Sequence, residues 1–364
     1  MVSGPAQCLL LLCIDVFIAD ASRGCPRLAG ASIDRLSYID ALNGRGRVEK
    51  PGGWMAPQSA YIAMMLSHVQ HSWGVFGSIG EIGVYKGLFF LSMALTRAPG
   101  ERLFACDMFL QSNLSDFQQS LQSFGIDPAC VRMRRSSSLK LTPASLRRSL
   151  LVPFRLLSVD GSHEASPVLS DLRLAAEVIA DGGVVILDDF TQDTWLTVRE
   201  GLYRFFFEAK GPTLAPFLMA CNKLYLTTPS HHKRMFDATY SSRGLAALKL
   251  SHLSNKGRGG GTLIAGWPVL IPMARRTVGA TSDKVLLGCE DVPTEAMVED
   301  WQVIAKGLER VGSLVDAGGS RPATEIQQPH AAVGFTALSS APTNARIAAW
   351  GGLVQELRRT TFAR

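Results

Sequence analysis

Three aspartates follow two apolar segments of the chain and could act together. Asp160 comes after the mostly apolar residues 154–159, and Asp188 and Asp189 come after the apolar residues 184–187. If these segments are neighbouring parallel strands, the three carboxylates meet at one sheet edge, where like charges raise one another's pKa unless a cation intervenes. Oxygen ligands suit a hard cation, so we expect Mg²⁺ or a similar ion there. The alternative is that one aspartate caps a helix and another faces solvent.

A histidine lies close to these carboxylates in the sequence. His163 follows Asp160 by three residues, in the loop over the predicted sheet edge. An imidazole with a pKa of about 6.5 can take a proton from a substrate hydroxyl at neutral pH. Asp188 or Asp189 is the alternative base, and a loop histidine can also be a plain polar residue. We therefore treat His163 and Asp188 as candidate catalytic residues.

A glycine-rich turn and a strand-end acid form a second group. The segment from Gly80 to Gly87 reads GEIGVYKG and lies between a predicted strand and a predicted helix. Glycine lets the backbone turn sharply and approach a ligand, although a tight structural turn would look the same. Asp107 ends the next predicted strand, where a carboxylate can accept both hydroxyls of a ribose or can cap a helix. Together they favour a nucleoside cofactor. The spacing fits neither the dinucleotide G-x-G-x-x-G loop nor the phosphate-binding G-x-x-x-x-G-K-[ST] loop.

The elements that position these residues alternate between strand and helix patterns. The predicted strands are 75–82, 102–107, 130–133, 154–160 and 184–188. The predicted helices are 57–71, 88–97, 114–124, 143–150, 168–180 and 194–208, and an apolar pair, 217–221 and 223–227, closes the series. This alternation predicts an α/β fold, a doubly wound and mostly parallel sheet. Such sheets bind ligands at the carboxyl ends of their strands, where the candidate residues lie.

Composition limits the remaining options. The 364 residues are 47% hydrophobic and 19% charged, which can fill a sizeable core. The net charge of +6 comes without a basic stripe, so we expect no nucleic-acid partner. The seven cysteines contain no CxxC pair, which disfavours a disulfide framework and a zinc knuckle and suits a reduced compartment.

We predict three regions along the chain. Residues 1–56 form an N-terminal extension and linker, 57–229 the α/β domain, and 230–364 a partly disordered C-terminal appendage with a helix near 295–312. The apolar run 8–19 is too short and too polar to span a membrane, so we expect no membrane association. Because no basic residue precedes it, we expect a cytoplasmic protein, with a signal peptide over 1–21 as the alternative.

Five segments together resemble the class I methyltransferases that use S-adenosylmethionine (SAM) and are related to macrocin O-methyltransferase. These segments are Gly80–Gly87, which contains E-x-G-x-x-x-G; Val159–His163; Asp171–Arg173; Gly182–Asp189; and Asn222–Tyr225. The resemblance covers about residues 57–228. It implies a seven-stranded Rossmann-like sheet, SAM as methyl donor, and Mg²⁺-assisted O-methylation of a sugar or another small hydroxylated metabolite.

The resemblance also implies roles for individual residues. Glu81, Gly83 and Gly87 would line the SAM loop, and Asp107 would hold the ribose. Asp160, Asp188 and Asp189 would ligate the metal, and His163 or one of these aspartates would assist deprotonation.

Two departures from the family pattern concern the cofactor. Tyr85 stands where a third glycine is common, and the triplet Ser136–Ser138 replaces Gly-Asp-Ser. The usual acidic contact to adenine is therefore missing, and Ser137 is its weaker replacement. We keep Tyr85 and Ser137 as candidate cofactor-binding residues.

Other functions and partners stay open at this stage. A catalytically silent SAM-binding or scaffold protein of the same fold is the main alternative, and a nicotinamide-dependent dehydrogenase is a second. Trp195, Tyr203 and Phe205–Phe207 could form an apolar wall for the acceptor or part of the core. The sequence does not fix the acceptor or the oligomeric state, and a homo-oligomer is one option.

Overall fold

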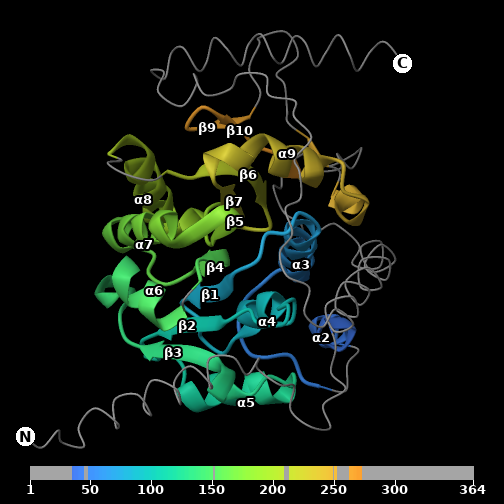
Figure 1. The fold of residues 1–364 in the computed structure, drawn as a ribbon, viewed down its shortest axis with the longest axis vertical. Helices are drawn as coiled ribbons and strands as arrows, with labels where there is room; N and C mark the ends of the chain where they lie inside the picture. The colour runs from blue at the N-terminus through green and yellow to red at the C-terminus, as the bar shows by residue number, and fades with distance from the viewer. Residues whose placement is uncertain are drawn as a thin grey trace, which may run out of the picture.

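The fold is built on one seven-stranded sheet with the strand order β3-β2-β1-β4-β5-β7-β6 (Figure 1). The computed structural model describes residues 35–44, 48–150, 152–208, 213–248, 250–251 and 262–272. The strands are β1 (Ser78–Ile82), β2 (Leu103–Asp107), β3 (Val131–Arg135), β4 (Phe154–Val159), β5 (Ile179–Leu187), β6 (Ala215–Ala220) and β7 (Lys223–Thr227). The first five are parallel, and β7 runs antiparallel to β5 and β6. The predicted doubly wound sheet is confirmed, and so are its seven strands.

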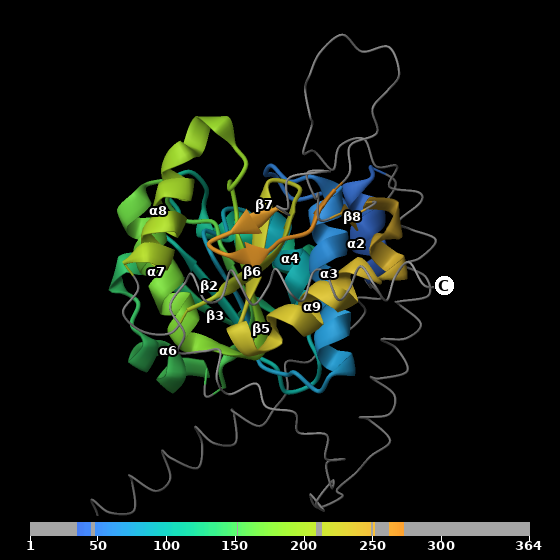
Figure 2. The same cartoon turned by 90° about the horizontal axis from the view of Figure 1, so that it is seen from above.

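Helices cover both faces of the sheet (Figures 1 and 2). One face packs against α6 (Pro143–Leu150), α7 (Ala165–Val178) and α8 (Leu196–Phe207). The other packs against α3 (Pro57–Ser72), α4 (Leu88–Ala94) and α5 (Leu114–Ser123). Successive residues of β5 alternate between the two cores, with Val184 and Ile186 on one side and Val185 and Leu187 on the other. Burial on both faces explains why residues 184–187 of this strand are all apolar.

Part of the predicted N-terminal extension belongs to the folded core. Residues Arg35–Leu42 form α2, where the linker prediction placed no element. The Tyr38 side chain is fully buried, its hydroxyl donates to the carbonyl of Leu88, and its ring meets Phe124 edge-on at 5.1 Å. The domain therefore begins before residue 57.

The domain also continues past residue 229. Helix α9 (His232–Tyr240) packs against β6, and short strands follow: β8 (Leu250–Ser251), β9 (Leu263–Ile264), β10 (Trp267–Pro268) and β11 (Ile271–Pro272). The Nε2 atom of His232 contacts the carbonyl oxygens of Pro216 and Pro268 at 2.9 and 3.0 Å. The predicted boundary at 229 is therefore too early, while the predicted helix near 295–312 lies outside the described residues.

Two further expectations concern the membrane and the thiols. Within the described ranges, no helix combines the length and apolar character needed to cross a bilayer. Cys106 is a free, buried thiol, as its apolar surroundings predict. Cys130 and Cys221 are disulfide-bonded, although the sequence disfavoured a disulfide framework and suited a reduced compartment. The cysteine spacing gave no sign of it.

Candidate active site

The loops that follow β1 and β4 are in backbone contact at a glycine. Gly83 follows β1 with φ +86°, and a Cβ placed on it would lie 1.8 Å from the carbonyl oxygen of Asp160. Gly87, also at φ +86°, would place a Cβ 2.8 Å from the ring of Phe117. Only glycine fits at either position. The predicted cofactor loop and the first predicted metal ligand are therefore in backbone contact.

Asp107 fastens this loop at the end of β2. Its Oδ2 accepts from the backbone N–H of Tyr85 at 2.8 Å, and its Oδ1 accepts from that of Phe109 at 2.5 Å. Each carboxylate oxygen keeps a lone pair for a further donor. Tyr85 itself adopts φ 47°, and its ring lies 5.7 Å from that of Trp54. The structure thus brings Asp107 and Tyr85 together, as the sequence predicts, and adds Trp54.

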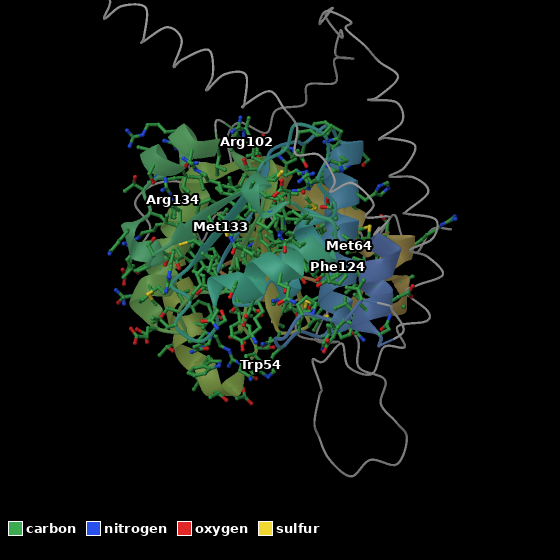
Figure 3. The ribbon with its side chains drawn as sticks, turned by 90° about the horizontal axis from the view of Figure 1, so that it is seen from below. Trp54, Met64, Arg102, Phe124, Met133 and Arg134 are labelled. Atoms are coloured by element: carbon green, nitrogen blue, oxygen red, sulfur yellow. The ribbon has the colours of Figure 1, made fainter. Side chains whose placement is uncertain are left out.

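Trp54 marks the outer side of this region. Its side chain is 86% exposed although it is large and apolar. In Figure 3, Trp54 and Arg102, which precedes β2, lie at opposite ends of the strands. The exposed indole therefore lies at the carboxyl edge, beside the loop after β1.

Glu81 lies beneath the loop and not on its surface. It is the next-to-last residue of β1 and is 1% exposed, and neither carboxyl oxygen has a hydrogen-bond partner among the described residues. Burial raises the pKa of Glu81 to about 8. Glu81 therefore lies in the strand below the loop, and its direct contact with the cofactor stays a prediction.

Ser137 and its neighbours form the turn after β3. The Ser137 hydroxyl accepts from the backbone N–H of Leu139 at 3.3 Å, which caps a short helix, Ser138–Lys140. The Ser138 hydroxyl donates to Oδ2 of Asp171 in α7 at 3.1 Å. Asp171 is buried, its Oδ1 has no partner among the described residues, and burial raises its pKa to about 6. An acid therefore does lie behind this turn, contributed by a helix distant in sequence.

Asp160, His163 and Asp189 form a half-buried cluster at the same edge. One potential ligand atom from each lies within 4.8 Å of the others. His163 Nε2 is 2.9 Å from Asp189 Oδ2, and the His163 ring packs on Trp195 with the ring centroids 4.3 Å apart. Three of the predicted site residues therefore come together.

Asp188 is not among the three grouped ligand atoms, although its carboxyl group lies against Asp160, and its role as a metal ligand stays a prediction. Its Oδ2 pairs with Nζ of Lys223, and its Oδ1 accepts from the backbone N–H of Asp189 at 2.8 Å. Both oxygens are thus engaged inside the protein. Asp188 and Asp189 are consecutive, and Asp189 adopts φ 55°. The two side chains therefore diverge, a feature that strand spacing alone does not reveal.

The carboxylates of this edge have opposite pKa shifts. Burial and the charge of Asp188 raise the pKa of Asp160 well above its ordinary value. Burial also acts against the charged form of Asp189, but the contacts from His163 and Asn222 outweigh it and lower the pKa. For Lys223 burial acts against the ammonium, yet the nearby Asp188 and Asp160 outweigh it and raise the pKa. Environments that separate the pKa values of neighbouring groups are typical of functional sites.

The hairpin between β6 and β7 supplies two residues that the sequence did not assign to the site. Cys221 and Asn222 both have positive φ, which is the geometry of a two-residue hairpin turn. Asn222 Nδ2 donates to Asp189 Oδ1 at 2.8 Å, and the Thr191 hydroxyl donates to Asn222 Oδ1 at 3.0 Å. Asn222 and Lys223 therefore hold Asp189 and Asp188 respectively. The turn residues were the available signal, but nothing in the sequence says where the turn points.

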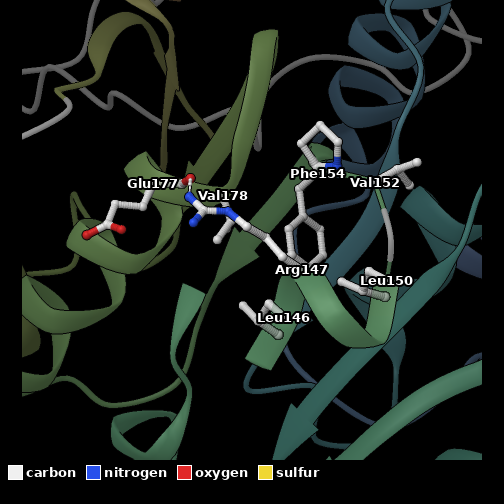
Figure 4. A pocket seen from close by; sticks show the side chains of 8 residues that line it. Leu146, Arg147, Leu150, Val152, Phe154, Glu177 and Val178 are labelled. Carbon is white, nitrogen blue, oxygen red and sulfur yellow. Dashed lines mark hydrogen bonds between the residues drawn. The ribbon is translucent and has the colours of Figure 1, made fainter. Parts of the chain in front are cut away.

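A cavity of about 350 Å³ lies elsewhere, at the amino end of β4 between α6 and α7 (Figure 4). Apolar residues such as Leu146, Leu150 and Phe154 line it, and Arg147 donates to the carbonyl of Glu177 at 2.8 Å. It contains none of the predicted site residues. The candidate site is therefore the carboxyl edge and not this cavity.

Residues 81–190 match a family model described as a methyltransferase domain. The chain contains a methyltransferase domain. The matched segment includes every predicted catalytic, cofactor-binding and metal-binding residue, and it confirms the prediction of a methyltransferase. The match is not resolved to the macrocin-related subfamily, which stays a prediction.

Solved structures with a similar chain trace include three O-methyltransferases. A TDP-rhamnose 3′-O-methyltransferase of calicheamicin biosynthesis is 14% identical, with a TM-score of 0.39 over 62% of this chain and 96% of that chain. An O-methyltransferase from Bacillus cereus, in complex with S-adenosylhomocysteine, is 13% identical, with a TM-score of 0.40 over 59% and 97%. One from Streptomyces achromogenes, involved in tomaymycin synthesis and in complex with SAM, is 18% identical, with a TM-score of 0.40 over 59% and 96%. Scores at this level assign neither cofactor nor substrate to the domain. No curated protein matches the chain.

Proposed function

We propose that the chain is a SAM-dependent O-methyltransferase that uses Mg²⁺ or a similar divalent cation and acts on a hydroxyl of a sugar or another small metabolite. One observation carries the proposal. The backbone contact between Gly83 and Asp160 supports it, because the glycine turn and the cluster of Asp160, His163 and Asp189 are then neighbours. Methyl transfer to oxygen needs this proximity, because donor and acceptor must be held in line.

The residues at the end of β1 and β2 suit a nucleoside cofactor. Gly83 and Gly87 leave a cradle that a Cβ would fill, and Asp107 has free lone pairs for the ribose hydroxyls. Ser137 and Ser138 would lie on the adenine side of the site. When bound, SAM supplies the methyl group on an already activated sulfonium.

The cluster after β4 and β5 suits a divalent cation. Asp160 and Asp189 offer carboxylate oxygens within 4.8 Å, and Mg²⁺ is usually held by one or two carboxylates and by water. When bound, the cation lowers the pKa of a coordinated hydroxyl and orients it. Two aspartates are therefore sufficient for this role.

His163 is the group that would take the proton of the acceptor hydroxyl. Its Nε2 faces Asp189 at 2.9 Å, so we assign the ring proton to Nε2 and the free lone pair to Nδ1. Asp189 then orients the ring and stabilises the imidazolium that forms. Asp188 is less suited to this task because Lys223 pairs with it.

The acceptor would lie on the side of Trp195. This residue is 39% exposed and belongs to the short helix Asp193–Trp195, before α8. The hydroxyl of Thr197 donates to the carbonyl of His163, which ties the start of α8 to the site. Phe205, in contrast, is buried and is part of the core. Of the aromatic residues considered from the sequence, Trp195 is the one whose ring packs against His163, so we assign the acceptor side to it.

The test is methyl transfer from labelled SAM to a panel of hydroxylated metabolites, with and without Mg²⁺. We expect Asp160→Asn to lower turnover by about 10²-fold or more, because it removes a carboxylate from the cation site, while affinity for S-adenosylhomocysteine stays within about threefold. Asp237→Asn, an exposed change on α9, is the matched control and should keep full activity. Full activity of Asp160→Asn in a chelator would refute the metal role, and failure to bind SAM in calorimetry would refute the whole proposal.

A further inference from the structure

Lys223 is a buried cation at the centre of the carboxyl edge. It is the first residue of β7 and is only 2% exposed. Its Nζ pairs with Asp188 Oδ2 and lies 4.1 Å from the centre of the Phe89 ring. A buried ammonium is costly unless it is paired, so its position beside Asp188 is a strong constraint on both side chains.

This pair distinguishes Asp188 from the other carboxylates of the edge, although the Asp188 carboxyl group also lies against Asp160. Both oxygens of Asp188 are engaged, one by the Lys223 ammonium and one by the backbone N–H of Asp189. Asp189 also has a contact at each oxygen, Asn222 at Oδ1 and His163 at Oδ2, but neither contact is a permanent cation. Asp160, His163 and Asp189 remain together, and all three are half-buried. The hairpin contacts both consecutive aspartates, since Asn222 donates to Asp189 while the next residue holds Asp188.

We propose that Lys223 is a positioning residue that withdraws Asp188 from the cation site, so that a divalent cation is held by Asp160 and Asp189 beside His163. This inference rests on the proposed function. The Lys223 ammonium neutralises the charge of Asp188, so the divalent cation has only the charges of Asp160 and Asp189 to balance. A site with two carboxylates keeps more coordination positions for water or for an acceptor oxygen than one with three.

The competing arrangement has Asp188 as a ligand, with Lys223 as a mere neighbour. The two arrangements differ in one variant that keeps the net charge constant. Asp188→Asn with Lys223→Met removes both members of the pair, so no buried charge is left without a partner. If Asp188 is withdrawn from the site, the double variant still binds the cation. If Asp188 is a ligand, the double variant loses cation affinity.

The experiment measures Mn²⁺ binding to the full chain by electron paramagnetic resonance of the free ion and by calorimetry. We expect the double variant to bind Mn²⁺ within about threefold of the unaltered chain, and Asp189→Asn to lose about tenfold or more. Lys223→Met alone frees Asp188 and should tighten Mn²⁺ binding by about tenfold, because affinity follows the charge of the ligand set. Lys233→Met, an exposed change on α9, is the control and should change nothing.

Affinity for S-adenosylhomocysteine, measured on each variant, shows that the site is folded. If Lys223→Met does not fold, the double variant still decides the question. A tenfold or greater loss of Mn²⁺ affinity in the double variant overturns the role of Lys223 and leaves the metal proposal intact. An unchanged Mn²⁺ affinity in a folded Lys223→Met variant has the same consequence. Absence of Mn²⁺ binding by the unaltered chain overturns both.

Discussion

Buried ionisable groups are paired at the amino ends of β1 and β4 and unpaired at the carboxyl end of β1. At the amino end, Arg155 of β4 is fully buried, and its guanidinium donates to Glu101 at 2.5 and 2.8 Å. The same group donates to Ser67 at 2.9 Å and to Gln70 at 3.1 Å, both in α3. At the carboxyl end, Glu81 of β1 is equally buried and has no partner among the described residues.

The pKa values of Glu101 and Glu81 therefore shift in opposite directions, because only one of these buried carboxyl groups has hydrogen-bond partners. Burial acts against the charged form of both. At Glu101 the hydrogen bonds from His71 and Arg155 outweigh it and lower the pKa to about 2. At Glu81 nothing outweighs it, and the pKa rises to about 8. The amino end uses charge to fasten α3 to the sheet, whereas the carboxyl end keeps unbalanced acids where ligands would bind.

The largest expected effect is at the amino end. Arg155→Met leaves Glu101 buried without its cation, and breaking such a pair costs about 3–5 kcal/mol of the free energy of unfolding. Urea denaturation followed by circular dichroism measures this loss. The acid sensitivity changes too: the lowered pKa of Glu101 gives stability that is present above its unfolded pKa and lost as the pH falls toward 2.

A paired variant serves as the control for that prediction. Arg155→Met with Glu101→Leu removes both charges, so most of the lost stability should return. If the double variant is as unstable as the sum of its single changes, the network is not the unit that we describe.

Sequence patterns predicted the frame of the site well. Alternating strand and helix patterns over 57–227 placed the strand ends correctly, because strands buried on both faces must be apolar. The sequence also singled out Gly83, because a close approach of two backbones requires glycine. It singled out Asp107 because a carboxylate at a strand end can accept several hydrogen bonds. The sequence also predicted that His163 lies near the aspartates, but not that it contacts Asp189.

The features that the sequence did not predict depend on side-chain direction and on distant segments. The partner of Asp188 is Lys223, 35 residues away, and the sequence shows no periodicity that links them. The positive φ of Asp189 turns it away from Asp188, and local spacing does not encode that. Likewise, Tyr38 and His232 belong to the core through contacts with Leu88 and Pro216, which linker-like composition concealed.

A smaller effect is expected at Glu81, at the carboxyl end of β1. The raised pKa of Glu81 means that its contribution to stability is present below the unfolded pKa of 4.5 and is lost as the pH rises through about 8. Glu81→Gln cannot ionise, so the fall in unfolding free energy between pH 5 and pH 9, roughly 2–4 kcal/mol, should disappear. Urea unfolding across this range, without SAM, measures it. Parallel curves for the two proteins would mean that Glu81 is not neutral in the folded state.

The smallest effect is expected at Asp171, behind the turn after β3. Its raised pKa of about 6 makes stability fall as the pH rises from 3.8 through 6, by about 1–2 kcal/mol. Asp171→Asn should remove this slope and keep an acceptor for Ser138. Ser138→Ala should instead move the slope to higher pH, because the hydroxyl that stabilises the carboxylate is gone. If Ser138→Ala moves the slope of stability against pH to lower pH or leaves it in place, the hydrogen bond does not set the ionisation of Asp171. Buried acids without a balancing partner would then be limited to the strand ends, and Asp171 in α7 would not be one of them.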